Sequence, residues 1–115
     1  MTKFRVKPTM KERWRYIAFE VMSDSKVPKN DVVRSFTTAL LRLFGEVGAS
    51  DTNIWLVDFN ETKKTGIVRC SHKAVNTLVS SISTVTTIND KQAGVLVKGI
   101  SGTIKKTGRF LHNNP

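Results

Sequence analysis

Cations and hydroxyl groups gather near the C-terminal end of the chain, in the run GISGTIKKTGRFL at residues 99–111. The run contains no acidic residue, and its glycines permit a close approach of the backbone to a ligand. Basic side chains together with Ser and Thr hydroxyls are groups that proteins use to contact phosphate oxygens. We therefore expect phosphate contacts from five side chains of this stretch: Ser101, Thr103, Lys105, Lys106 and Arg109.

Most of the net charge lies at the two ends of the sequence. The 115 residues include 19 Lys and Arg against nine Asp and Glu, a net charge of +10. Residues 1–15 hold six bases and one acid, residues 98–115 hold four bases and no acid, and residues 16–97 hold nine bases and eight acids. Basic ends can be mere solvated tails, but segregation of this kind favours a polyanionic partner.

The sequence gives little support for a disulfide, a metal site, a membrane span or a signal peptide. Cys70 is the only cysteine and there are two histidines, so neither a disulfide within the chain nor a zinc site is expected. Asp58 and Glu61 have hairpin-like surroundings and indicate solvated charges, whereas two-metal phosphodiester cleavage needs clustered carboxylates. No apolar run has the length of a membrane span, and the first one contains Glu20, which does not fit a signal peptide. We expect a cytoplasmic protein with no bound cofactor, no membrane partner and no catalytic residue.

The apolar periodicity predicts a single α+β domain over residues 1–115. Alternating apolar residues predict strands, and apolar residues spaced by three and four predict helices. The order is that of a ferredoxin-like, RNA-recognition-like sandwich, with an antiparallel four-stranded sheet in the order 4-1-3-2 and a further short C-terminal helix. The predicted segments are an irregular basic arm at 1–12, strands at 15–22, 53–59, 66–72 and 95–100, helices at 31–48 and 73–85, a loop at 89–94 and a basic segment at 101–115.

The helix boundaries and faces follow from single residues. Asp31 suits the beginning of the first helix, Gly48 suits its end, and Ser71 suits a cap for the second helix. Arg34 and Arg42 fall outside the apolar stripe of the first helix and are expected to face solvent. The stripe itself is expected to face the core and consists of Val33, Phe36, Leu40, Leu43, Phe44 and Val47.

The predicted topology brings distant basic segments together. In the 4-1-3-2 order, the ends of the third and fourth strands lie beside the start of the first. The N-terminus of the second helix lies at the same edge and would add free N–H groups for a phosphate. Together with the C-terminal side chains above, the candidate RNA-binding residues at this edge are Lys11, Arg13, Arg15, Arg69, His72 and Lys73.

Aromatic and other single residues have alternative interpretations. Trp14 and Tyr16 lie beside arginines and are candidates for base stacking, although Tyr16 is better interpreted as packing on the sheet. His72 is better interpreted as a structural residue, and Cys70 as a small buried hydrophobe. The third strand, TGIVRCSH, has no aromatic residue, so we expect contacts to RNA backbone and shape rather than to short sequence motifs. The uncovered sheet face is available to a protein partner, and the apolar second strand predicts self-association.

Three blocks, KPTMKERWRYIAFEV, GIVRCSHKAV and GISGTIKKTGRFL, resemble the archaeal ribonuclease P protein component 2 family, whose eukaryotic relatives are subunits of nuclear ribonuclease P. The resemblance extends from about Lys7 to Leu111. It implies an RNA-recognition-like fold with extra helices, which binds the catalytic RNA of ribonuclease P together with a component 3 partner that resembles a TIM barrel. In that holoenzyme the RNA, with Mg²⁺, removes the 5′ leader from precursor tRNA.

The resemblance carries over to basic positions inside the matched blocks and leaves two alternatives open. Gly108 departs from it, because a better helix former is expected there. A general structured-RNA-binding or ribosome-associated module would have the same composition, and selectivity among RNAs would separate it. A small enzyme on a ferredoxin-like scaffold would be active without RNA. The positions carried over are Arg13, Arg15, Arg69, His72, Lys73, Lys105, Lys106 and Arg109.

Overall fold

The structure is a computed structural model in which residues 13–112 are described. The predicted arm at 1–12, including Lys11, and residues 113–115 lie outside the described part. A 3₁₀ turn at His72–Ala74 precedes the second helix. The strands and helices are β1 (Trp14–Met22), α1 (Lys29–Thr52), β2 (Trp55–Asn60), β3 (Thr65–Ser71), α2 (Val75–Ile82), β4 (Thr87–Ile88), β5 (Lys91–Gln92), β6 (Gly94–Ser101) and α3 (Ile104–His112).

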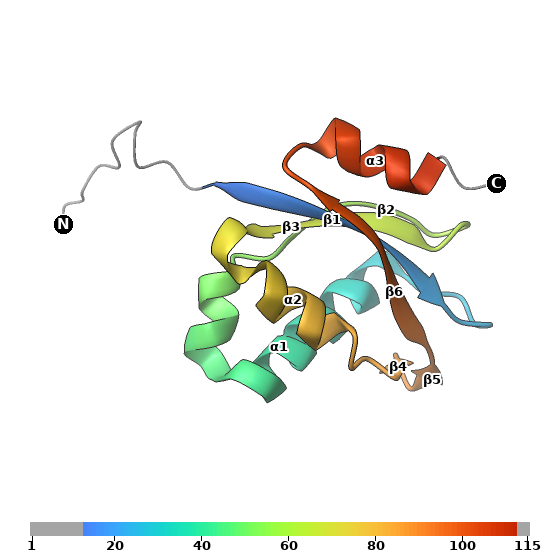
Figure 1. Ribbon diagram of the computed structural model, residues 1–115. Helices are drawn as coiled ribbons and strands as arrows, with labels where there is room; N and C mark the ends of the chain where they lie inside the picture. Colours follow the sequence, from blue (N-terminus) through green and yellow to red (C-terminus); the bar gives the residue numbers. More distant parts are fainter. Residues whose placement is uncertain (1–12, 113–115) are drawn as a thin grey trace.

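Four strands form one antiparallel sheet in the order β2-β3-β1-β6. Since β6 is the fourth strand of this sheet, the predicted order 4-1-3-2 and the α+β, ferredoxin-like class are confirmed. Helices α1 and α2 lie on one face of the sheet, and α3 lies on the other (Figure 1). We call the face under α1 and α2 the inner face and the face that carries α3 the outer face.

The core lies between the inner face and helices α1 and α2. Alternate residues of β1 point into it, as the period of a strand requires. The ring of Phe19 lies 5.1 Å from Phe36 of α1 and 6.0 Å from Phe59 of β2. A Cβ atom at Gly66 would lie 2.6 Å from the Asp58 carbonyl oxygen, so β3 needs a glycine there. Fully buried side chains from every layer complete the core: Ile17, Val32, Leu40, Val68, Leu78 and Ile82.

The second half of α1 differs from the prediction. The helix continues past Gly48 to Thr52, and the backbone is instead interrupted at Gly45, whose φ of 73° favours glycine. The residues after this break do not continue the face that Phe36 and Leu40 turn toward the core. The predicted inward stripe is wrong for four of its six members, which are exposed: Val33, Leu43, Phe44 and Val47.

Three smaller elements were also predicted differently. The segment 89–94, expected to be a loop, forms the turn and second strand of the β4–β5 hairpin, which turns through Asn89 and Asp90 with φ values of 55° and 65°. Helix α2 is shorter than expected, because the 3₁₀ turn replaces its first residues. Ser71 precedes that turn but makes no side-chain capping hydrogen bond to it. Arg34 and Arg42 are exposed, as predicted.

Helix α3 covers part of the outer face. The Thr107 hydroxyl lies 2.7 Å from the Thr103 carbonyl oxygen and 3.4 Å from that of Tyr16 in β1. Phe110 lies against Gly99 of β6, where a Cβ atom would come within 2.3 Å of the ring. The predicted C-terminal helix is thus confirmed, and the expectation of an uncovered sheet face is correct only for the part that α3 leaves open.

Candidate nucleic-acid interface

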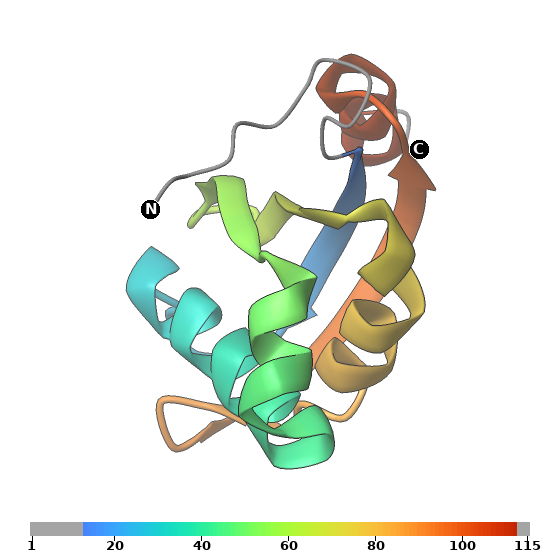
Figure 2. The same cartoon turned by 90° about the vertical axis from the view of Figure 1, so that its left-hand side faces the viewer.

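One end of the sheet collects basic residues from three segments of the chain. Because the strands are antiparallel, β1 and β2 begin there and β3 and β6 end there (Figure 2). Trp14 pairs with Ser71, and Tyr16 pairs with Ser101, so the segments meet within one or two residue pairs. We call this end the basic edge. Its predicted RNA-binding side chains are Arg13, Arg15, Arg69, His72, Lys73, Ser101, Thr103, Lys105 and Lys106.

The start of β1 is tied to the segment before α3. Arg13 is exposed, and its carbonyl oxygen accepts a 2.9 Å hydrogen bond from the His72 N–H. Arg15 is half-buried, and its Nη1 donates to the Trp14 carbonyl oxygen at 3.0 Å. The same Nη1 lies 3.6 Å from the place of a Cβ atom at Gly102. The fold therefore fixes the backbone that carries these two guanidinium groups.

Helix α3 begins at the basic edge, and its cations lie in two places along the helix. The Thr103 hydroxyl accepts the Lys106 N–H at 3.2 Å and so caps the helix. Lys105 and Lys106 lie exposed in the first turn. Arg109 is also exposed, but it follows Thr107, which contacts β1 from the outer face. Arg109 therefore lies over the sheet, about 9 Å further along the helix than the cap, and not at the basic edge.

The expected anion site at the N-terminus of the second helix is not formed at His72. The N–H of this residue is already bonded to the Arg13 carbonyl, and α2 begins only at Val75. The Nδ1 atom of His72 is buried and has no hydrogen-bond partner. Lys73 is exposed beside it. The third strand thus contributes side-chain charge to the basic edge, while the His72 amide is occupied within the fold.

Arg69 lies between the two tryptophans of the chain. Its guanidinium carbon is 3.9 Å from the centre of the Trp14 ring and 5.8 Å from that of Trp55. Trp55, the first residue of β2, pairs directly with Arg69 and is 61% exposed. Sequence reasoning missed Trp55, although the predicted pairing of the second and third strands already placed it beside the end of the third. Tyr16 is half-buried, and α3 contacts its strand, which supports the interpretation that it packs on the sheet.

Cys70 is buried and lies directly across from Arg15 in the sheet. Burial raises the pKa of the thiol from 9.0 to about 11, and the positive charge of Arg15 opposes part of that rise. The thiol is therefore neutral at physiological pH. The interpretation of Cys70 as a small buried hydrophobe is confirmed.

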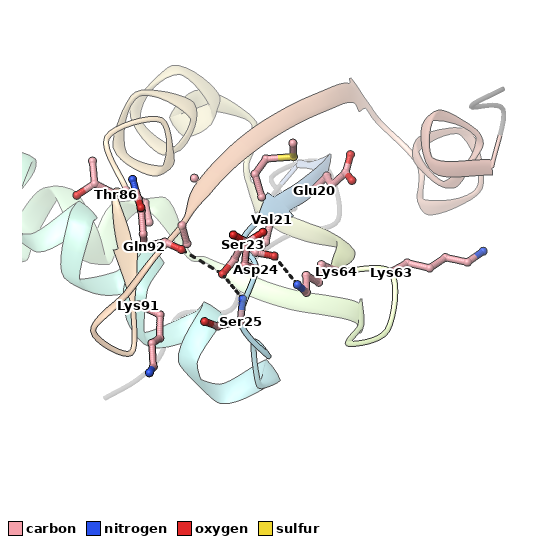
Figure 3. Close-up of a pocket in the computed structure, with 14 residues that line it drawn as sticks. Glu20, Val21, Ser23, Asp24, Ser25, Lys63, Lys64, Thr86, Lys91 and Gln92 are labelled. Carbon is pink, nitrogen blue, oxygen red and sulfur yellow. Dashed lines mark hydrogen bonds between the residues drawn. The ribbon is translucent and has the colours of Figure 1, made fainter.

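A hollow of about 890 Å³ lies at the opposite end of the sheet (Figure 3). The Lys64 ammonium donates to the Ser23 carbonyl, and the Ser23 hydroxyl donates to the Gln92 carbonyl at 3.1 Å. These bonds hold the loops around the hollow together. Within residues 13–112, no group of three His, Cys, Asp or Glu side chains could hold a metal ion. No helix in that range is long and apolar enough to cross a membrane.

Comparison with known proteins gives one consistent result. Residues 15–112 match the Rpp14/Pop5 family. The chain is 39% identical over 102 residues to ribonuclease P protein component 2 of Pyrococcus furiosus, covering 89% of this chain and 85% of the relative. It is 39% identical over 110 residues to the protein of that name from Methanosarcina barkeri, covering 95% and 80%. In fold it is similar to a chain in the structure of yeast ribonuclease MRP, with a TM-score of 0.68, 17% identity, and coverage of 81% of this chain and 76% of that one.

Proposed function

Because the chain belongs to the Rpp14/Pop5 family, we propose that it is a protein subunit of ribonuclease P and binds the catalytic RNA of that enzyme through the basic edge. Relatives named ribonuclease P protein component 2 support the choice of enzyme. One observation carries the RNA contact: basic residues from the start of β1, the end of β3 and the start of α3 meet at one end of the sheet.

The role of the basic edge is electrostatic. Lys and Arg side chains neutralise phosphates and release condensed counterions, so affinity falls as salt rises. Contacts to phosphates position a protein on an RNA without reading its sequence. In this proposal the RNA, with Mg²⁺ bound at the RNA, removes the 5′ leader from precursor tRNA. The polypeptide lowers the repulsion between phosphates and so supports the folded RNA at a lower Mg²⁺ concentration.

The proposal includes a component 3 subunit as the protein partner. Four exposed apolar side chains of α1 favour a protein contact, and we call them the apolar strip: Leu41, Leu43, Phe44 and Val47. Phe44 and Lys73 line the same hollow, of about 620 Å³, so the apolar strip and the basic edge are neighbours. Apolar surface of this kind typically marks a protein contact. A partner on the apolar strip would lie next to the RNA that the basic edge holds.

Reconstitution tests the role in the enzyme. Ribonuclease P RNA is mixed with this protein, with a component 3 protein, or with both, at limiting Mg²⁺, and cleavage of precursor tRNA is followed. We expect cleavage to rise only when both proteins are present. If the protein binds the RNA, and unrelated structured RNAs equally well, but never changes cleavage, the chain is a general RNA-binding module and the proposal is wrong.

A matched pair of triple variants tests the basic edge and α3. Substituting Lys105, Lys106 and Arg109 by Ala should lower the slope of log K against log [salt] by about 2 to 3, since each phosphate contact contributes roughly 0.7 to 0.9. The control carries the same loss of charge at exposed lysines far from this end of the sheet: Lys26, Lys63 and Lys91. Its slope should stay within about one unit of the wild-type slope. Equal effects of the two triples would show that only net charge matters.

A further inference from the structure

The two tryptophans and Arg69 form an ordered cluster on the outer face of the sheet. Trp14 comes from β1, Arg69 from β3 and Trp55 from β2, so three adjacent strands contribute one side chain each. Arg69 is the direct partner of Trp55 in one ladder and of Tyr16 in the other. The guanidinium carbon lies 3.9 Å from the centre of the Trp14 ring, which is a close cation–π contact. The cluster lies beside the basic edge, where Arg69 itself is one of the cations.

Contacts within the described part of the protein do not cover the Trp55 ring or provide a hydrogen-bond partner for Arg69 Nε. Trp55 is 61% exposed at the edge strand, and its ring centre is 5.8 Å from the Arg69 guanidinium, near the outer limit of a cation–π contact. The Arg69 Nε atom is buried and has no hydrogen-bond partner. The contacts that position the Arg69 guanidinium are therefore those with the two rings and not hydrogen bonds from Nε. An exposed indole beside a stacked guanidinium offers a flat surface to a further planar group.

The chemistry of the cluster favours a nucleobase over a protein side chain. Every base has a π face, and unpaired bases stack on aromatic rings and on Arg guanidinium planes. Exposed cations of the basic edge lie at the same end of the sheet as the cluster, where they could meet phosphates of the same RNA strand: Arg13, Lys73 and Lys105. The apolar strip of α1 is different, because its side chains are aliphatic or phenyl groups without a stacked cation.

We propose that Trp14, Arg69 and Trp55 form a stacking platform that holds an unpaired base of the bound RNA, a contact that rests on the proposed RNA-binding function. The usual RNA-recognition sheet stacks bases on aromatic residues of its first and third strands. Here the third strand supplies an arginine, and the exposed ring comes from the second strand, at the sheet edge. The platform adds recognition of an unpaired base to the phosphate contacts of the basic edge.

Two measurements on the full-length protein test the platform. The chain has only two tryptophans, and both belong to the platform, so its indole fluorescence reports on this site alone. A short single-stranded oligoadenylate should quench that fluorescence, and the matching RNA duplex should not. Trp55→Ala should weaken binding to ribonuclease P RNA roughly five- to hundredfold at fixed salt, because each stacked base contributes an energy of that order. Since stacking releases few counterions, the salt slope should stay unchanged.

Two variants provide the controls. Trp55→Phe keeps an aromatic face and should retain most of the affinity, whereas Leu96→Ala removes another exposed apolar side chain, from β6, and should bind as the wild type does. The platform is refuted if Trp55→Ala binds the RNA with wild-type affinity, or if the duplex quenches as strongly as the single strand. Loss of affinity for a component 3 protein with RNA affinity intact would make the platform a protein contact and would also refute it. Failure of the proposed function is distinct, since the wild type would then show no salt-dependent binding of ribonuclease P RNA.

Discussion

The contact between Gly99 and Phe110 decides where α3 lies, and Gly99→Ala tests it. The added Cβ atom would come within 2.3 Å of the Phe110 ring, so the ring must leave the sheet. Phe110 is 40% exposed, and losing the buried remainder costs roughly 1–2 kcal/mol. The contact of Thr107 with the Tyr16 carbonyl, weakened at the same time, adds about 1 kcal/mol. The substitution should therefore destabilise the docking of α3 by about 2–3 kcal/mol.

Trypsin measures this docking directly, because α3 contains Lys105, Lys106 and Arg109. If cleavage requires the helix to leave the sheet, a loss of about 2–3 kcal/mol raises the cleavage rate roughly 30- to 150-fold. The free energy of unfolding in urea should fall by less than the docking free energy of α3. The substitution leaves the core between the sheet and helices α1 and α2 untouched, and that core still unfolds after α3 has left the sheet. A matched control is Gly108→Ala, whose added Cβ meets nothing within 4 Å. It should stabilise α3 by about 1 kcal/mol and slow cleavage.

The sign of the Gly99→Ala effect makes the test decisive. Glycine inside a strand costs roughly 0.5–1 kcal/mol relative to alanine, and Gly99 has no positive φ that would require it. If α3 did not pack on β6, the substitution would be neutral or stabilising. A variant with unchanged or slower cleavage would thus refute the placement of α3, and with it the placement of Arg109 over the sheet.

Two further predictions concern the buried thiol and the apolar strip. Burial raises the pKa of Cys70 from 9.0 to about 11, so the stabilisation that depends on a neutral thiol is complete below pH 9 and is lost between pH 9 and 11. Relative to Cys70→Ala, the wild type should lose unfolding free energy in urea only within that window. A difference between the two proteins that stays constant with pH would contradict the burial argument. The sequence predicts self-association through the apolar second strand, and the exposed apolar strip of α1 offers a further surface for it. Leu43→Ser with Phe44→Ser should then shift sedimentation toward monomer, and each substitution should cost roughly 1–2 kcal/mol of stability because more than half of each side chain is buried. A wild type that is monomeric at every concentration would contradict this prediction.

The sheet could be predicted from the sequence because two simple rules determine it. Alternation in segments such as IAFEV locates a half-buried strand, and right-handed crossovers leave one arrangement for this order of elements. The end of α1 could not be predicted in this way. Glycine often ends a helix, but α1 continues past Gly48 to Thr52, whose hydroxyl donates to the Gly48 carbonyl within the helix at 2.9 Å. Thr52 is fully buried, which indicates that packing stabilises this last turn.

The candidate site was predictable to the extent that the backbone determines it. The meeting of the β1 start with the ends of β3 and β6 follows from strand order alone and needs no side-chain detail. The position of Arg109 depends on the fit of Phe110 against Gly99, which no periodicity reveals. Trp55 was missed because aromatic residues were sought on the first and third strands, where RNA-recognition sheets usually carry them.

The strand order also explains why the charge sits at the two ends of the sequence. Since β1 and β6 are antiparallel neighbours, the start of the first strand and the end of the last lie side by side. Arg13 and Arg15 at the start of β1 therefore lie at the same end of the sheet as Lys105 and Lys106 of α3, and the repulsion among these charges lowers the stability of the folded protein. A bound polyanion removes that repulsion and adds its own binding energy, so RNA binding and the stability of the basic edge are linked. Under the proposed function, the residues that weaken the free protein would thus strengthen its complex with RNA.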